Sequence, residues 1–393
     1  MIGRLTLAAF FLFLASSYVS IAVNSIALVL TAALWATGMV LRRRWEVRPT
    51  PLDWFILAYV AAQAIATIFS LDPAQSLLYS KRIALIALVY FVVSVIRDRK
   101  SLERSVAILL GAAALVGTLG VLKTVLDSTE GPTRLGIFQF YMTTSELMMM
   151  AGAFLLAFVL HPRTPLRVRL LALAALLPVL GSLYATVTRG AYLAFAAAAL
   201  LILIARNRAL IIGLVVIVVL LVVFSPPYVV DRVKSITDVH HPENASRLMI
   251  WSAGVKIFLD YPLSGVGDID LGNLLNEYAG PGYPGLWGHM HNVALQYLVT
   301  LGLFGFLAVA ALHGAIAVNE WRAFRATASD WFLGSVTLGA LAAFLGLHVH
   351  GLTEWTFGDQ EAAVLFWTSV GFALSARAIG GKDFSGNASG GGA

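Results

Sequence analysis

Long apolar stretches alternate with short polar segments along most of this chain. We interpret the apolar stretches as membrane-spanning helices, because roughly 20 apolar residues cross the hydrocarbon core of a bilayer. The predicted spans are residues 5–22, 24–41, 53–70, 82–96, 105–125, 141–160, 168–186, 190–205, 209–225, 291–318, 331–349 and 361–379. The pattern therefore predicts an all-α polytopic membrane protein with about 12 transmembrane helices.

One long polar segment, residues 226–290, interrupts the spans. Its prolines and glycines predict a folded loop with turns, and residues 243–259 have the apolar spacing of a short amphipathic helix. The chain then divides into helices 1–9 (1–225), this loop (226–290), helices 10–12 (291–379) and a tail (380–393). The tail is rich in Gly, Ser and Asn, which predicts disorder.

Composition supports a membrane protein and excludes several other classes. Hydrophobic residues make up 59% of the 393 positions and charged residues 12%. A soluble domain has about 45–50% hydrophobic and about 25% charged residues. The chain has no cysteine, which excludes disulfides, thiolate metal sites and cysteine nucleophiles. The net charge of +6 comes from basic residues spread over short loops, so we expect no nucleic-acid partner.

The basic residues also predict the orientation in the membrane. If Arg4 is cytoplasmic, alternation of the spans places 18 of the 27 basic but 7 of the 21 acidic residues on the same side. Basic residues in short loops remain inside, so both termini are predicted to be cytoplasmic. The 226–290 loop then lies outside, which in a bacterial inner membrane is the periplasm.

The chain's main candidate for acid–base chemistry lies where this loop meets the next span. His291 and Asn292 follow the polar segment, and Gly302 and Gly305 follow in the apolar run. Histidine has an ordinary pKa of about 6.5, so it exchanges protons near neutral pH. The two glycines predict close packing of this helix on a neighbour. The alternative is a helix start whose polar residues face lipid headgroups.

Two arginines on the same predicted side suggest an anion site. Arg189 follows a span end and Arg247 lies in the loop; guanidinium groups match phosphate oxygens in bidentate geometry. With the histidine, they favour binding of a phosphate or pyrophosphate. Interfacial anchoring and a solvated loop charge are the alternatives. Lys81 and Arg82 either add to this positive field or anchor the chain at the interface.

Other polar residues near the predicted outer face have more than one candidate role. Glu146 lies inside a predicted span and is expected to pair with Lys123. His350, Glu354 and Asp359 follow a later span, where they orient a base, bind a sugar or provide surface polarity.

We expect no metal and no cofactor. Asp268-Ile269-Asp270 matches a short acidic pattern of metal-dependent sugar transferases, but three residues match easily by chance. His289 and His291 have the spacing to begin a metal site, yet no further ligand lies near them in the sequence.

The chain resembles the O-antigen ligase family, within the wider group of O-antigen ligases and polymerases. The family motif is His, then Asn, Ser or Gln, nine residues, Gly, two residues, and Gly, Thr or Tyr. Here it is His291-Asn292, residues 293–301, Gly302, Leu303-Phe304 and Gly305. Arg247 with Trp251, Pro262–Gly267 and Thr188-Arg189-Gly190 also resemble the family's pattern. Residues 139–143 depart from it, because relatives often carry an asparagine there.

The resemblance implies a glycosyltransferase of lipopolysaccharide biosynthesis. The implied donor is a glycan on undecaprenyl pyrophosphate, and the implied acceptor is a sugar hydroxyl of lipid A–core. Transfer would be inverting and metal-independent, at a periplasmic active site in the inner membrane. His291 would be the general base, and Arg189 and Arg247 would hold the pyrophosphate and stabilise its departure. We further predict substrate contacts for Asn292, His289, His350, Lys81 and Arg82.

Three other functions remain open at this stage. An O-antigen or exopolysaccharide polymerase would use the same kind of donor with a growing glycan as acceptor. A transporter of lipid-linked sugar suits twelve spans, but the sequence shows no two-half repeat. A purely structural membrane scaffold is disfavoured by the predicted intramembrane charges at Arg189 and Glu146.

Overall fold

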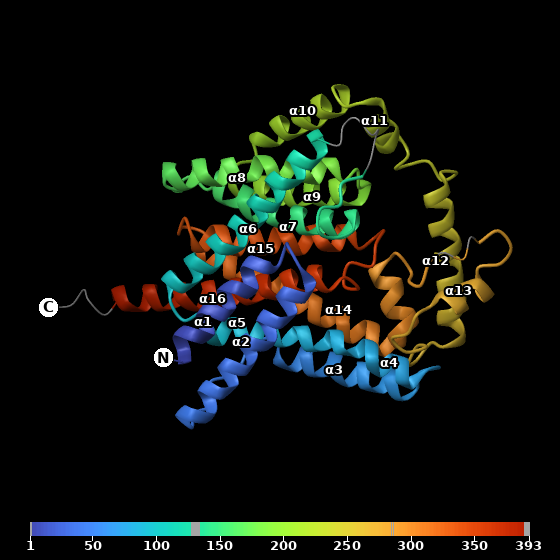
Figure 1. The fold of residues 1–393 in the computed structure, drawn as a ribbon, viewed down its shortest axis with the longest axis horizontal. Coiled ribbons are helices and arrows are strands. Elements are labelled where there is room, and N and C mark those ends of the chain that lie inside the picture. Colours follow the sequence, from blue (N-terminus) through green and yellow to red (C-terminus); the bar gives the residue numbers. More distant parts are fainter. Residues whose placement is uncertain (1, 127–133, 284, 286, 389–393) are drawn as a thin grey trace.

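The computed structural model describes residues 2–126, 134–283, 285 and 287–388, and every regular element among them is a helix (Figure 1). The elements in chain order are α1 (Ile2–Ser16), α2 (Ile21–Arg42), α3 (Asp53–Ile68), α4 (Pro73–Tyr79), the 3-10 helix η1 (Ser80–Ile86), α5 (Ala87–Val95), α6 (Arg99–Leu126), α7 (Tyr141–Leu160), α8 (Leu166–Ala185), α9 (Arg189–Arg206), α10 (Leu210–Val223), α11 (Pro227–Lys234), α12 (Pro242–Asp260), α13 (Gly272–Tyr278), α14 (Val293–Thr327), α15 (Leu333–His350) and α16 (Gln360–Ala388). The predicted all-α class is confirmed for this part of the chain.

Every predicted span coincides with a helix or with consecutive helices. Among the described residues, nine helical segments are long and apolar enough to cross a membrane, or ten if the bent pair α10 and α11 is one span. The apolar helices α1 and α3 are shorter than a typical span. A multi-pass membrane architecture is therefore supported, whereas the count of twelve remains a prediction.

The interior of the bundle is formed by α7, α15 and α16, whose residues are mostly buried. Small residues allow this density: Gly339 lies against Phe154 and Gly346 against Met149, so close that an added Cβ would come within 3 Å of either side chain. By contrast, α10 has no buried residue. An apolar helix of this kind is stable only against lipid or another apolar surface, so α10 is suited to the bundle periphery.

The predicted amphipathic helix is α12, and it packs on α13 and α14 around a small core of its own. Ile250 and Ile257 face this core together with Leu275 and Met290, and the Trp251 Nε1 donates a hydrogen bond to the Met290 carbonyl at 3.0 Å. Figure 1 shows α12 and α13 at one end of the molecule and both labelled termini toward the other. The helices α12 and α13 therefore lie at the opposite end of the bundle from the start of α1 and the end of α16.

The chain past residue 380, predicted to be disordered, begins as helix, since α16 continues to Ala388. Residues 389–393 lie outside the described part of the chain.

The motif glycine Gly302 breaks α14. Its φ of 67° and ψ of −171° interrupt the helix, and the freed carbonyls of Val299 and Thr300 accept hydrogen bonds from the Val266 and Gly267 amides, both at 2.9 Å. An added Cβ on Gly302 would lie 2.3 Å from the Leu263 carbonyl oxygen. The close approach predicted for this glycine is therefore to the backbone of the loop before α13. We expected a neighbouring helix.

Gly302→Ala should destabilise the protein by about 1–3 kcal/mol, because a positive φ and a backbone clash are imposed together. The measurement is the midpoint of thermal unfolding in detergent. Gly314→Ala, in the same helix, is the matched control, because its added Cβ meets nothing within 4 Å. Equal midpoints for the two variants would contradict this account of the break.

Candidate functional site

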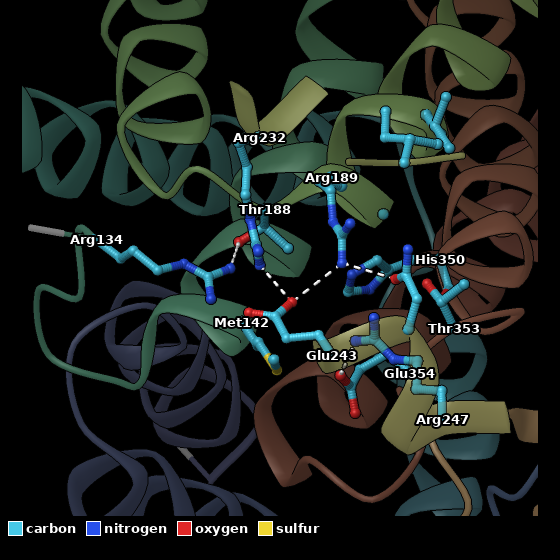
Figure 2. Close-up of a pocket in the computed structure, with 14 residues that line it drawn as sticks. Arg134, Met142, Thr188, Arg189, Arg232, Glu243, Arg247, His350, Thr353 and Glu354 are labelled. Atoms are coloured by element: carbon cyan, nitrogen blue, oxygen red, sulfur yellow. Dashed lines mark hydrogen bonds and ion pairs between the residues drawn. The ribbon is translucent and has the colours of Figure 1, made fainter. Parts of the chain in front are cut away.

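A cavity lined by four arginines lies where α9, α11, α12 and the end of α15 meet (Figure 2). Arg189 and Arg247 were predicted to share a site, and the structure brings both to this cavity. It adds Arg134 and Arg232, which the sequence analysis did not select. The acidic residues of the lining are Glu243 and Glu354. Four guanidinium groups around two carboxylates make a site suited to an anion with several oxygens.

Arg189 is the first residue of α9 and is 7% exposed. A buried cation at the positive end of a helix dipole is stable only when its donors are paired. Its Nη1 donates to the Ser235 carbonyl at 2.6 Å and to the Ser235 hydroxyl at 2.9 Å. Its Nη2 donates to Glu243 Oε2 at 3.1 Å and to Asn244 Oδ1 at 2.9 Å. The arginine therefore joins α9 to the junction of α11 and α12.

Glu243 receives two arginines on one oxygen. Its Oε2 accepts from Arg232 Nη2 at 2.6 Å as well as from Arg189. Burial alone raises the pKa of Glu243, but the hydrogen bond and charge of Arg232 and the charge of Arg189 lower it below its ordinary value. Glu243 is therefore ionised at neutral pH. No motif in the sequence marks Arg232 or Glu243. Only the fold of the loop brings these two residues to Arg189.

Arg134 supports the turn that leads into α9. It donates to the carbonyls of Thr186 at 3.3 Å and Val187 at 3.2 Å, and its guanidinium lies 3.5 Å from the centre of the Tyr141 ring. Val187 has a φ of 51°, which a β-branched residue rarely adopts. Arg134 thereby stabilises a strained turn one residue before Thr188, the N-cap position of α9, and so positions Arg189.

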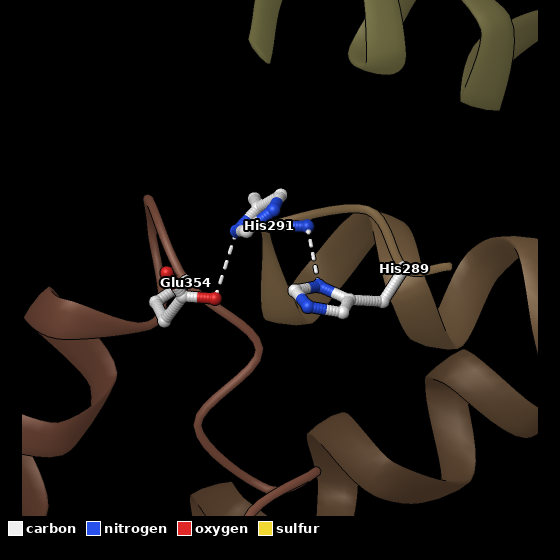
Figure 3. Close-up of side chains that lie close together, drawn as sticks. All are labelled: His289, His291 and Glu354. Carbon is white, nitrogen blue, oxygen red and sulfur yellow. Dashed lines mark hydrogen bonds and ion pairs between the residues drawn. The ribbon is translucent and has the colours of Figure 1, made fainter. Parts of the chain in front are cut away.

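The predicted base is connected to this cavity through Glu354. His291 Nδ1 lies 2.8 Å from Glu354 Oε1, while Glu354 Oε2 lies 3.8 Å from Arg247 (Figures 2 and 3). A carboxylate beside Nδ1 favours the tautomer with its proton on that nitrogen and the lone pair on Nε2. The Nε2 of His291 is buried and has no partner among the described residues. Glu354 therefore orients the imidazole, one of the roles predicted for it.

The surroundings of Glu354 and His289 lower the pKa of both groups. Burial raises the pKa of Glu354, but the hydrogen bond and charge of His291 outweigh burial and lower it to about 2. Burial, with the charge of His291 second, lowers the pKa of His289 to about 4. At neutral pH, Glu354 is ionised and His289 is neutral.

The His–Asn pair of the motif has a positive φ at the histidine and a helix cap at the asparagine. His291 has a φ of 47°, and its amide faces the ring of His289 at 3.3 Å. Asn292 caps α14, since its side chain accepts from the Leu295 amide at 2.9 Å and donates to the Leu352 carbonyl at 3.0 Å. These two bonds join the start of α14 to the segment that carries Glu354. The predicted substrate contact of Asn292 stays a prediction.

A second histidine–carboxylate pair borders the cavity. His350 lines the cavity, and its Nδ1 lies 3.0 Å from Oε1 of the fully buried Glu146. The predicted pair of Glu146 with Lys123 is therefore wrong. Lys123 is exposed and donates to the Gly136 carbonyl at 3.0 Å, because its position at the end of α6 lets it reach the following loop.

Lys81 and Arg82 do not line the arginine cavity. Arg82 lies 3.8 Å from Asp268 in a separate cavity that Tyr59, Gln63 and Tyr297 also line. Lys81 is exposed on η1 and lines neither cavity. Whether these two residues contact a substrate stays a prediction.

His289, His291 and Glu354 can be compared with a metal site (Figure 3). The expectation that no further ligand lies near the two histidines is wrong, because the fold brings Glu354 to them from 63 residues away. Their ligand atoms lie within 4.8 Å of one another. Zinc–nitrogen bonds of about 2.1 Å demand ligand atoms about 3.4 Å apart. The limit of 4.8 Å includes this separation, so the three residues could hold a metal ion.

Comparison with known proteins identifies the segment that contains most of this site. Residues 174–310 match the family model described as O-antigen ligase. The match confirms the predicted resemblance to the O-antigen ligase family for this segment of the chain. It runs from α8 into α14 and includes Arg189, Arg247, His291 and the Gly302 break. No curated protein sequence matches the chain.

The lowered pKa of Glu354 predicts a pH dependence of stability. A carboxyl whose pKa falls on folding stabilises the fold above its unfolded pKa, near 4.5, and this contribution is lost as the pH falls toward about 2. Melting midpoints in detergent should therefore drop between pH 5 and pH 3 less steeply in Glu354→Gln than in the unaltered protein. Glu277→Gln should keep the full drop. Identical slopes in all three proteins would contradict the assignment.

Proposed function

We propose that this protein is an O-antigen ligase, which transfers a glycan from undecaprenyl pyrophosphate to a sugar hydroxyl of lipid A–core at the periplasmic face of the bacterial inner membrane. The observation that carries the proposal is the connection from the arginine cavity to His291 through Glu354. It joins a site for an anionic leaving group to a candidate base. The family match supports the ligase and polymerase group.

The proposed reaction is a single inverting displacement at the anomeric carbon. The acceptor oxygen attacks that carbon, the bond from the carbon to the pyrophosphate oxygen breaks, and the electron pair leaves with the pyrophosphate. The proton of the acceptor hydroxyl moves to His291 Nε2, the nitrogen without a partner. Glu354 stabilises the imidazolium that results. Water then removes the proton.

Arginines supply the electrostatic part of the mechanism. Negative charge accumulates on the pyrophosphate as it departs, and prearranged cations stabilise that charge more than they stabilise the ground state. Arg189 and Arg247 are the residues proposed for this role, with Arg134 positioning Arg189. The proposal is therefore a metal-independent transfer, and activity that disappears with EDTA and returns with a divalent cation would contradict it.

A polymerase of the same group would share the donor and the chemistry. Only the acceptor differs, so the deciding experiment offers purified protein a lipid-linked glycan with and without lipid A–core. Glycan attached to core supports the ligase, and a lengthened donor glycan supports the polymerase. A folded protein that does neither with competent substrates would direct attention to transport.

His291→Ala should lower the transfer rate by about 10²–10⁴-fold, the usual contribution of general-base catalysis. Donor binding should be retained, because His291 lies outside the lining of the arginine cavity. The measurement is the single-turnover rate with a purified donor and lipid A–core. His240→Ala, an exposed loop histidine, is the control. A normal rate in His291→Ala would exclude the base role.

Arg189→Lys should reduce transfer at least about tenfold, because an ammonium cannot reproduce the planar fork of a guanidinium. Arg189 uses both terminal nitrogens, Nη1 toward Ser235 and Nη2 toward Glu243 and Asn244. Arg208→Lys, at an exposed position after α9, preserves charge in the same way and is the matched control. Equal transfer rates in the two variants would show that Arg189 acts only as an anchor.

A further inference from the structure

One carboxylate oxygen occupies the point between two arginines of the cavity. Glu243 Oε2 accepts from Arg232 at 2.6 Å and from Arg189 at 3.1 Å. The Glu243 side chain is 38% exposed, whereas those of Arg189 and Arg232 are 7% and 14% exposed. The acid is thus accessible to solvent, while the cations that it neutralises are held in the wall (Figure 2).

The remaining contacts of Arg189 do not depend on Glu243. Ser235 holds Nη1, and Asn244 accepts from Nη2. Asn244 is itself fixed, since its Nδ2 donates to the carbonyls of Ser235 at 2.9 Å and Asp238 at 2.7 Å. Withdrawal of Glu243 would therefore leave this guanidinium in place with a donor directed at the vacated position.

Arg232 also has a side-chain donor without a partner among the described residues. Its Nη2 donates to Glu243, but its Nε is buried without a partner among the described residues. One donor of Arg232 therefore has a partner and another has none among the described residues. An anion with several acceptor oxygens matches such a guanidinium better than the single oxygen of Glu243 does.

We propose that Glu243 is an exchangeable counter-ion, which neutralises Arg189 and Arg232 until the pyrophosphate of the donor displaces it and binds both arginines. The inference deepens the proposed donor-binding role of the cavity and rests on it. A pyrophosphate carries more charge and more oxygens than a carboxylate, so it competes well for the two forks. Before the pyrophosphate binds, the Glu243 carboxylate neutralises the buried charge of Arg189 and the largely buried charge of Arg232.

The test compares Glu243→Gln with the unaltered protein in binding of inorganic pyrophosphate. Glutamine keeps the size of the side chain and one acceptor oxygen but removes the competing charge. Full-length purified protein in detergent, titrated by calorimetry at low salt, should bind pyrophosphate about tenfold more tightly in Glu243→Gln, as expected for loss of a close competing charge. The gain should shrink at high salt, because salt screens partly exposed charges.

Two further variants isolate the cause. Glu277→Gln removes one negative charge from α13, outside the cavity lining, and should leave the dissociation constant unchanged. Arg232→Gln should weaken pyrophosphate binding, and adding it to Glu243→Gln should cancel the gain. If Glu243→Gln does not fold, Glu243→Asp tests the same idea, because a shortened carboxylate competes less well and should give a smaller gain.

The outcomes separate this proposal from the proposed function. Unchanged or weaker binding in a folded Glu243→Gln protein, with clear binding by the unaltered protein, overturns the exchange but leaves the donor site intact. Absence of binding in both proteins overturns the exchange and the anion site together. Tighter binding in Glu243→Gln with no transfer activity in any protein supports the exchange and contradicts the ligase.

Discussion

The buried guanidinium of Arg189 is the interaction on which the site depends. A cation at the start of α9 opposes the helix dipole and has little contact with water, so each of its donors needs an acceptor. The α11–α12 junction supplies them through Ser235, Asn244 and Glu243. Pairing this charge draws the loop over the end of the bundle, and the loop in turn brings Arg232 and Arg247 to the same cavity.

A second constraint holds the other half of the site. The break at Gly302 lets α14 accept hydrogen bonds from the 262–267 loop, and the Asn292 cap ties the start of α14 to Leu352. His291 immediately precedes the Asn292 cap and lies within hydrogen-bonding distance of Glu354. The family motif thus combines one candidate chemical group with residues whose observed task is to shape the backbone around it.

The sequence predicted the helical class, the approximate helix positions and the meeting of Arg189 with Arg247, because these follow from apolar periodicity and from the sidedness of charge. It did not predict Arg134, Arg232 or Glu243, which lie outside the predicted spans in segments without a motif and acquire their roles only through long-range folding. The mistaken Lys123–Glu146 pair has the same origin. Glu146 and Lys123 belong to consecutive predicted spans, whereas the actual partner of Glu146, His350, lies 204 positions away in the sequence.

The central claim is that the pyrophosphate of a lipid-linked donor binds in the arginine cavity with its sugar directed toward His291. The most direct measurement is a cryo-EM structure of the full-length protein in lipid nanodiscs with a non-hydrolysable undecaprenyl pyrophosphate glycan. We predict density for the two phosphates among Arg189, Arg232 and Arg247, with the anomeric carbon on the His291 side. Phosphate density beside Arg82 and Asp268 in the second cavity, with the arginine cavity empty, would contradict the account.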